Sequence, residues 1–493
     1  MTTITPTTGT ITSAGIGSGL DVNSIISSLM AVESQPLTAL KSKATTLQTD
    51  LSAFGQVQSL VSSLQDAAKT LMDPNSFNLT NTSSTNSSSV SATTTNGAVP
   101  GAYSVSVSSL SAGQSIVSPT GQYTDGTSVV GTGSLTIQLG SWSADHSTFT
   151  PGTGAAVTIP IGASSDTLAG VAAAINSANA GVSATVVSDA SGGRLALQSN
   201  TTGTANGFRI SVADADGNNT DASGLSRLAY DPQNGAGQMT LAQAAANAQA
   251  TINGISVTSA SNTLSSVIGG VTFNLGQTTT QPVTINVTPN TTAIQTDVTG
   301  FVSAFNALNT FLVTETKYDP TTNTAAPLQG DSTAVSIQNQ MHNLISQMTG
   351  ASSTFSTLSS LGIQLQTDGS LQLNSTTFNS ALTNLAELTK ALSNVDATTA
   401  SNNGFGAVFS NWADSLLTTG GTLPGKTAAI QSSITSNQKD QATMNTELAA
   451  TQARLQAQYT ALDATMSQAN ALAAYVQQQF YAKSSFGSGS SSN

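Results

Sequence analysis

The two ends and the middle of this 493-residue chain carry different apolar patterns. Near both ends, apolar residues recur with heptad spacing, which is typical of helices that pack along one stripe. In the middle they alternate with polar residues, which is typical of strands in antiparallel sheets. Between Lys69 and Glu315 there is no Lys and no Glu, only scattered Asp residues and three Arg. The pattern predicts one helical unit interrupted by a long β-rich insert, an architecture that favours assembly over catalysis.

Two helices are expected near the N-terminus. The first follows Asp21 and is interrupted by Pro36, because proline lacks a backbone N–H and crowds the preceding turn. The second ends at Asp73-Pro74-Asn75, and helix returns near residue 292. We predict that apolar stripes on these helices form the core of one helical body, and its candidate core residues are Leu40, Leu47, Leu51, Phe54, Phe301, Phe305 and Leu308.

The last helix is expected to be long, because one heptad frame fits its apolar residues with a single polar miss at Gln452. We define these residues as the seam, and its members are Leu448, Leu455, Tyr459, Leu462, Met466, Ala469, Val476 and Phe480. Almost no charge flanks the seam, so ion pairs at its edges cannot select a partner. The seam packs either within the chain or between subunits, and we expect both.

Other segments of the C-terminal part are expected as follows. Asp331 caps a helix that runs to about residue 348, residues 361–373 form a hairpin, and a helix covers about 376–393. Residues 400–426 are Gly-rich and are expected to be irregular.

The middle of the chain predicts two β-rich blocks. Residues 80–98 form a Ser/Thr/Asn tract, after which apolar residues alternate as far as about residue 212, with one short helix around Leu168, Val171 and Ile175. A second block covers about 250–290 and contains Asn253-Gly254, a strong hairpin signal.

The expected fold class is a multidomain α+β protein. A discontinuous helical bundle from N- and C-terminal segments, with a β-hairpin, carries two inserted antiparallel β-rich domains, and coiled-coil-like helices lie at the termini. The expected boundaries are 1–40 for a disordered or helical terminal segment; 41–79 plus 291–430 for the helical bundle; 80–118 plus 236–290 for a β-domain; 119–235 for an outer β-rich domain; and 431–493 for the C-terminal helix and a disordered tail.

Composition excludes several classes of function. Only 7% of the residues are charged, against about a quarter in ordinary globular proteins. The net charge of −12 argues against binding to nucleic acid or an anionic membrane. The chain has no Cys, which excludes disulfides and thiolate sites. No signal-peptide core and no apolar run long enough for membrane insertion are found, so a cleaved signal and a transmembrane helix are not expected.

Three features could suggest chemistry, and each is better read as structure. Gly15-Ile16-Gly17-Ser18-Gly19 lacks the preceding strand that a phosphate loop requires. The segment 214–219 lacks the Gly and Glu positions of a calcium loop. The only histidines, His146 and His342, lack a neighbouring carboxylate cluster. We therefore expect no catalytic residue, no cofactor and no metal.

Four parts of the chain carry a specific combination of residues. They are Gly17-Ser18-Gly19-Leu20-Asp21 with Ile25, Leu29-Met30, Glu33 and Pro36-Leu37; Ile252-Asn253-Gly254-Ile255 with Asn262-Thr263 and Gly270-Val271-Thr272; Leu328-Gln329-Gly330-Asp331-Ser332 with the 361–373 hairpin; and Leu455 to Phe480. In this order they resemble the flagellar filament cap family (FliD, hook-associated protein 2). The second part looks like the hook "IN" motif, and residues 119–235 carry little of the resemblance.

The resemblance implies a structural, non-enzymatic protein outside the cell, at the distal tip of the bacterial flagellum, that helps exported flagellin to fold and insert for filament elongation and motility. It implies a homo-oligomeric ring, a pentamer, with flagellin, hook–filament junction proteins and a cytoplasmic export chaperone as further partners. It also implies export by the flagellar type III system without a cleaved signal peptide. The alternative functions are a surface adhesin whose β-domains bind host or surface glycans and, more remotely, a secreted hydrolase.

We further expect residues about 1–40 and 440–493 to be largely disordered in the free protein and to order as paired helices against filament subunits, because disordered segments that fold on binding adapt to a changing partner.

Overall fold

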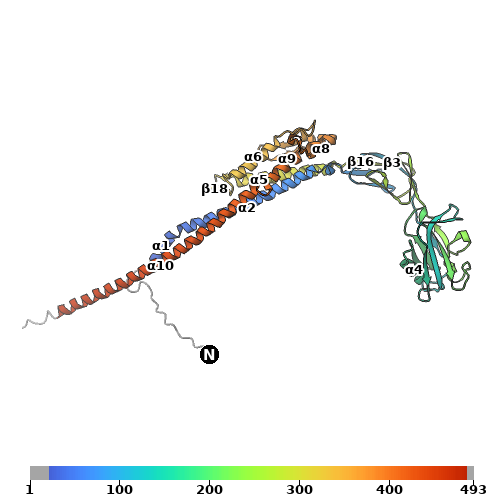
Figure 1. The fold of residues 1–493 in the computed structure, drawn as a ribbon, viewed down its shortest axis with the longest axis horizontal. Coiled ribbons are helices and arrows are strands. Elements are labelled where there is room, and N and C mark those ends of the chain that lie inside the picture. The colour runs from blue at the N-terminus through green and yellow to red at the C-terminus, as the bar shows by residue number, and fades with distance from the viewer. Residues whose placement is uncertain (1–20, 486–493) are drawn as a thin grey trace, which may run out of the picture. The chain divides into compact units, whose positions relative to one another are not determined.

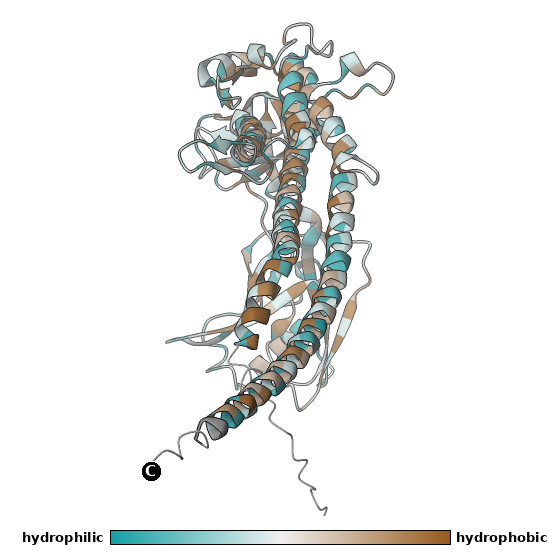
Figure 2. Ribbon diagram, turned by 90° about the vertical axis from the view of Figure 1, so that its left-hand side faces the viewer, coloured by the Kyte–Doolittle hydropathy of each residue, from teal (hydrophilic) through white to brown (hydrophobic). Residues whose placement is uncertain are grey.

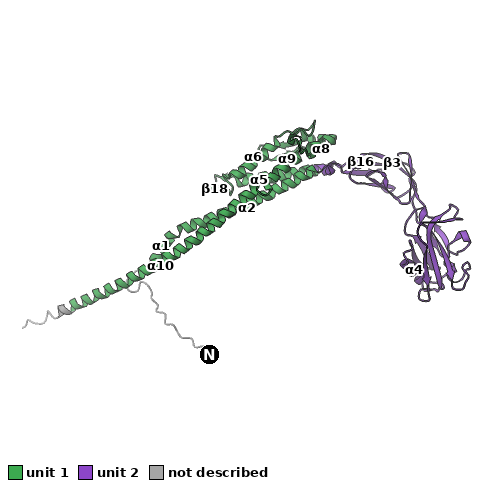
Figure 3. Cartoon of the chain, viewed as in Figure 1, with its two compact units in different colours: residues 1–73, 296–493 green, residues 74–295 purple. Residues whose placement is uncertain are grey.

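The computed structural model describes residues 21–485, and the side chains of residues 482–485 are not described. The chain divides into two compact units, which Figure 3 distinguishes by colour. Unit 1 comprises Met1–Asp73 and Thr296–Asn493, and unit 2 comprises Pro74–Gln295. The chain thus leaves unit 1 after α2 and returns to it within α5. This confirms the predicted α+β class with a discontinuous helical part and a β-rich insert.

Unit 1 is mainly helical (Figure 1). Its helices are α1 (Val22–Glu33), α2 (Gln35–Met72), most of α5 (Thr291–Glu315), α6 (Ser332–Ile345), α7 (Ser375–Ala381), α8 (Leu385–Ser393), α9 (Phe405–Leu417) and α10 (Thr422–Ser485). Two small hairpins pair β17 (Tyr318–Asp319) with β18 (Thr324–Ala325) and β19 (Ile363–Leu365) with β20 (Leu371–Leu373). The second is the predicted 361–373 hairpin. Helix α2 packs against both α9 and α10.

The break between α1 and α2 lies close to its predicted place. The helices meet at Ser34, and Pro36 lies in the first turn of α2. Proline is tolerated there because the first backbone N–H groups of a helix have no partner within it. At the other end of α1, the side chain of Asp21 accepts a hydrogen bond from Ser24 N at 3.0 Å and caps the helix.

The prediction of irregular structure over residues 400–426 was wrong. Residues 405–417 form α9, and α10 begins at Thr422. Phe405, Phe409 and Trp412 are buried, so the segment carries an apolar stripe that its many glycines concealed. A Cβ built on Gly406 would lie 2.8 Å from the Leu392 carbonyl oxygen and 2.9 Å from that of Ala68. This glycine therefore permits close packing of α9 against α2 and α8.

Helix α10 is also longer than expected. It runs without a break through residue 431, where the sequence suggested a domain boundary. Leu423, Ile430 and Ile434 in its first part are buried. The first part of α10 consequently belongs to the packed helical body.

The first β-rich part of unit 2 lies next to residues 74–77, which form the short helix α3 (Pro74–Phe77). A five-stranded antiparallel sheet has the order β1 (Thr80–Ser84), β16 (Val283–Pro289), β3 (Gly101–Ser109), β12 (Ala248–Ile252), β13 (Ile255–Ser259). A three-stranded sheet has the order β14 (Thr263–Ile268), β15 (Val271–Leu275), β2 (Val90–Thr94). Residues from both sheets share one apolar core that includes Val105, Phe273 and Ile285.

The second β-rich part of unit 2 has its own apolar core, which includes Ile137, Leu197 and Phe208. One sheet pairs β5 (Gly133–Trp142) with β10 (Gly207–Asp214), β6 (Phe149–Pro151) and β7 (Val157–Ile161). The other has the order β11 (Thr240–Gln243), β4 (Ser115–Val117), β9 (Gly192–Ser199), β8 (Val182–Asp189). The predicted short helix is α4 (Leu168–Ser177), and its three predicted apolar residues are buried.

Amide side chains replace missing backbone partners at four places. In each, the amide oxygen accepts from the N–H of one residue, and the amide nitrogen donates to the carbonyl of the same residue, as a neighbouring strand would do. The four pairs are Gln114 with Phe208, Asn176 with Ala184, Asn262 with Ser111, and Asn306 with Leu371. A chain with few charges thus uses amides to satisfy buried backbone groups.

Candidate assembly surface

The C-terminal end of α10 has no packed face among the described residues. Helix α1 lies along α10 and buries Val22 and Ile26, whose side chains are 2% and 6% exposed. Beyond α1, no other described element of unit 1 lies along α10 (Figure 1). Every residue from 467 to 481 is exposed.

The exposure of the seam residues also increases towards the C-terminal end of α10. Its members Leu448, Leu455, Tyr459 and Met466 are half-buried. Its members Leu462, Ala469, Val476 and Phe480 are exposed, and Phe480 shows 71% of its surface. Figure 2 shows hydrophobic positions recurring along α10 towards its C-terminal end. Exposed apolar residues gathered on one element mark an interaction surface.

Three exposed apolar residues of α10 lie off the seam and were not predicted. Leu472, Tyr475 and Tyr481 are 64%, 59% and 77% exposed. With 3.6 residues per turn, Tyr475 and Tyr481 lie about 100° or more around the helix from Val476 and Phe480, whereas Leu472, four residues before Val476, shares its face. The end of α10 therefore offers apolar side chains in more than one direction, which suits contact with more than one neighbouring helix.

Charge contributes little to this surface. Residues 441–485 contain only Glu447, Arg454, Asp463 and Lys483 as charged residues. Recognition by this part of α10 must then depend on shape and apolar contact, since few ion pairs can form along it.

The candidate core residues of the helical body lie in two environments. Phe54, Phe301, Phe305 and Leu308 are fully buried, each 0% exposed. The other three candidates, Leu40, Leu47 and Leu51, are half-buried along α2. The aromatic rings meet α9, because Phe409 lies 5.0 Å from Phe301 and 6.2 Å from Phe305 between ring centres.

Lys426 joins three helices of unit 1 and is a contact that the sequence patterns did not reveal. Its Nζ donates to Asp331 Oδ2 at 2.6 Å and lies 5.2 Å from the centre of the Phe54 ring. Asp331 also caps α6, as predicted, by accepting from two backbone N–H groups of its first turn. In the sequence, only the rarity of Lys in this chain could have drawn attention to Lys426.

Two carboxyl groups near Lys426 have shifted pKa values. Burial opposes ionisation of Asp331, but hydrogen bonds from Lys426 and from backbone N–H groups hold its pKa below the ordinary value. Burial, and secondly the charge of Asp331, raise the pKa of the Asp50 carboxyl. Asp50 Oδ1 is buried without a hydrogen-bond partner among the described residues.

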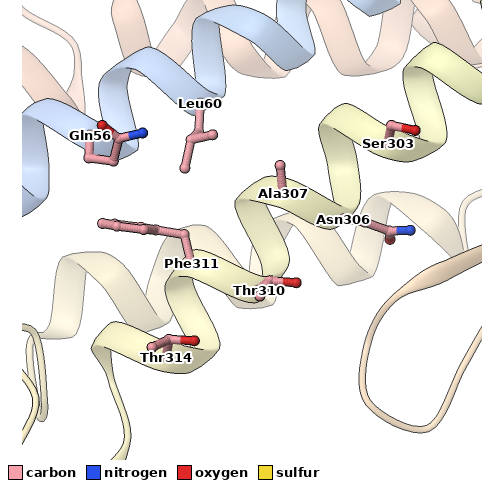
Figure 4. A pocket seen from close by; sticks show the side chains of 8 residues that line it. All are labelled: Gln56, Leu60, Ser303, Asn306, Ala307, Thr310, Phe311 and Thr314. Carbon is pink, nitrogen blue, oxygen red and sulfur yellow. The ribbon is translucent and has the colours of Figure 1, made fainter.

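An open groove of about 670 Å³ lies between α2 and α5 (Figure 4). It is lined by Gln56, Leu60, Ser303, Asn306, Ala307, Thr310, Phe311 and Thr314. None of these residues is charged or is a histidine, so the groove offers no group for acid–base chemistry.

The remaining candidates for chemistry occupy structural positions. His342 shares a 2.9 Å hydrogen bond with Asn309 Oδ1, and burial lowers the pKa of its ring. His146 lies in a turn with φ of 58°. In the 214–219 segment, Asp214 and Asp216 accept hydrogen bonds from nearby Ser and Asn groups. Within residues 21–485 no group of His, Asp or Glu is arranged to hold a metal ion; Gly15–Gly19 lie outside the described residues.

Comparison with known proteins gives the family. A model of the flagellar hook-associated protein 2 N-terminus matches residues 18–114, and a model of its C-terminus matches residues 245–471. A flagellar hook-associated protein 2 from Escherichia coli (strain K12) is 32% identical over 481 residues, which cover 95% of this chain and 98% of that protein. The chain belongs to the flagellar hook-associated protein 2 family.

Two further similarities agree with this membership. The B-type flagellar hook-associated protein 2 of Pseudomonas aeruginosa is 30% identical over 92% of this chain and 94% of its own length. The crystal structure of the D1-D2-D3 domains of the E. coli flagellar cap protein FliD is similar with a TM-score of 0.59 and 30% identity, covering 77% of this chain and 99% of that one.

One part of the predicted resemblance was misplaced. A model of the flagellin hook IN motif matches residues 147–201, not the segment beginning at Ile252. Residues 119–235 therefore carry more family signal than expected. The Ile252-Asn253-Gly254-Ile255 segment falls within the C-terminal family match. The short Ile252-Asn253 pair is not specific to the motif, because Asn253-Gly254 turns are common to many hairpins.

No helix among residues 21–485 has the combination of length and apolar character that a membrane span requires.

Proposed function

We propose that this chain caps the distal end of the flagellar filament and promotes the folding and insertion of exported flagellin there. Membership of the family makes it a structural cap protein that acts outside the cell at the flagellar tip. The observation that carries the proposal is a match over almost the whole length of the family, in a chain whose longest helix ends in an exposed apolar surface.

We assign the proposed partners to two surfaces, the β-rich unit 2 and the seam of α10. The β-rich unit 2 forms the plate of a homo-oligomeric ring, a pentamer. The seam of α10 contacts flagellin and, before the filament has grown, the hook–filament junction proteins. A cytoplasmic chaperone delivers the chain to the flagellar type III system, which exports it without cleaving a signal peptide.

The termini are proposed to change state during the cycle. We propose that residues 1–40 and 440–493 are largely disordered in the free protein and order against filament subunits; residues 1–20 and 486–493 lie outside the described residues. In the structure, α1 starts at Val22 and packs along α10, which reaches Ser485, so the proposed disorder requires these two helices to separate in the free protein. The exposed end of α10 supports the proposal, because a helix with no packed face is only marginally stable in water. Rapid hydrogen exchange in these segments of the isolated protein is expected; full protection of both ends would contradict it.

Deletion of the gene tests the function. The proposal predicts short or absent filaments, loss of swimming, and flagellin released into the medium, all restored by the intact gene. Normal filaments and swimming together with loss of surface attachment would instead support the adhesin alternative, which no observation favours at present.

A further inference from the structure

The chain contains five Asn-Gly pairs, at Asn96, Asn206, Asn234, Asn253 and Asn403. Asn followed by Gly is the pair most prone to spontaneous loss of its side-chain amide, because Gly does not shield its backbone nitrogen with a side chain. Reaction requires the Asn Cγ to reach the nitrogen of the following residue. A side chain held by a hydrogen bond must first be released.

Four of the five side chains are held by a hydrogen bond. Asn206 Nδ2 donates to Thr202 O at 2.7 Å, and Asn234 Nδ2 donates to Asp231 Oδ2 at 2.8 Å. Asn253 Oδ1 accepts from a backbone N–H at 2.8 Å, and Asn403 Oδ1 accepts from another at 2.7 Å.

In two of these four pairs, the glycine nitrogen that would attack the amide also donates a hydrogen bond. The nitrogen of Gly404 donates to Asn394 O at 2.8 Å, and that of Gly235 donates to Pro232 O at 3.3 Å. Asn403 is in addition only 8% exposed. Attack by either glycine nitrogen therefore requires a second hydrogen bond to break.

Asn96 differs from the others. Its side chain is exposed and makes no hydrogen bond to any described residue. It lies in the turn Thr95–Ala98, which Ala98 N closes by donating to Thr95 O at 3.3 Å. Gly97 has φ of +86°, and open space surrounds the position that its Cβ would take. Among the described residues, no hydrogen bond restrains the Asn96 amide, and no side chain crowds Gly97.

We infer that Asn96 is a site of spontaneous deamidation, and that it reacts first among the five pairs. The nitrogen of Gly97 bonds to Asn96 Cγ, the Cγ–Nδ2 bond breaks, and ammonia leaves with the proton of Gly97 N. The product is a cyclic succinimide. Water then opens the ring: cleavage at Cγ leaves an ordinary aspartate at this position, and cleavage at the backbone carbonyl leaves an isoaspartate.

The isoaspartate product alters the fold locally because it adds one methylene to the main chain. Ala98 is 4% exposed and belongs to the core of the first β-rich part. A Cβ built on the facing Gly270 would lie 2.8 Å from Ala98 Cα, so the backbones already touch closely. A longer turn displaces Ala98 from this contact, whereas the ordinary aspartate product leaves the main chain unchanged.

The test is to age the full-length protein at mildly alkaline pH and to map all five sites by mass spectrometry. No Lys or Arg lies between Lys69 and Arg194, so trypsin leaves Asn96 in one long peptide, and pepsin at acid pH is the suitable protease. Asn96 is expected to react at least about tenfold faster than each other site, the factor given by the loss of one hydrogen bond of about 1.4 kcal/mol.

Two controls make the result decisive. In guanidinium the five pairs lose their fold-dependent restraints, so the advantage of Asn96 should disappear. The first acidic variant seen by ion exchange of aged native protein should be missing from Asn96→Gln. Faster reaction at another pair in the native protein, an unchanged ranking after unfolding, or persistence of that acidic variant in Asn96→Gln would each overturn the inference.

Discussion

Substitution of Phe409 by Ala is expected to destabilise unit 1 strongly. Phe409 is 0% exposed and its ring packs edge-on against Phe301 and Phe305, so it joins α9 to α5. Truncation of a buried Phe to Ala costs about 3–5 kcal/mol. Phe409→Leu keeps most of the volume but loses both ring contacts, at about 0.5–1.5 kcal/mol each, so about 1–3 kcal/mol is expected.

The two tryptophans allow the assay to separate the units. Trp412 lies in unit 1 and Trp142 in unit 2, and the chain has no other Trp. Urea unfolding followed by fluorescence in a Trp142→Phe background reports unit 1 alone, and a Trp412→Phe background reports unit 2 alone. Phe409→Ala should move the unfolding transition of unit 1 to a lower urea concentration and leave that of unit 2 unchanged.

Asn411→Ala is the matched control, because Asn411 is exposed on the same helix. It should change the free energy of unfolding by less than about 0.5 kcal/mol. If Phe409→Ala lowers the stability of unit 1 by no more than this control, or shifts both transitions equally, α9 does not close the helical core as described.

Three further changes probe other contacts of unit 1, each measured by the Trp412 transition. Asn306→Ala removes both hydrogen bonds to Leu371 and should cost about 2 kcal/mol, since one such bond contributes about 1 kcal/mol; no change would mean that water replaces the amide. The pKa of Asp331 is lower in the folded protein, so its carboxylate stabilises the fold above its unfolded pKa, and this stability is lost as pH falls through the folded pKa. Asp331→Asn should therefore flatten the decline in the free energy of unfolding below about pH 4. An unchanged slope would contradict the role of Lys426. Leu51→Asp should lower stability by about 1–3 kcal/mol, because it places a carboxylate at a half-buried position; unchanged melting would show that this part of α2 is not core.

The sequence predicted the features that repeat locally. Heptad spacing located Phe301 and Phe305 in the core, and the capping rule located Asp331 at the start of α6. The contacts that fix these elements are long-range and leave no local pattern. Lys426 and Asp331 are 95 residues apart in sequence. Asn306 supplies the strand partner of Leu371 from a helix, a role that its position in the heptad does not indicate.

Two stretches of the chain form regular structure that their composition does not indicate. The glycines of residues 400–426 are typical of a loop, but Gly406 permits close packing of α9. Strands β1 and β2 arise from a hydroxyl-rich tract without apolar alternation. There Thr82 Oγ1 and Ser84 Oγ donate to the carbonyls of Ala92 and Val90, each at 2.6 Å. Composition alone does not distinguish hydroxyl groups that bridge strands from those of a loop.

The central claim is that the seam of α10 binds the filament, and a paired substitution tests it directly. Cells whose only copy carries Val476→Asp and Phe480→Asp are compared with cells carrying Ala471→Asp and Gln478→Asp, which add the same charges on the opposite side of the helix. Filament length by electron microscopy is the measurement, with secretion of each variant verified. The account predicts short filaments and released flagellin for the seam pair and normal filaments for the control pair; normal filaments for both would contradict it.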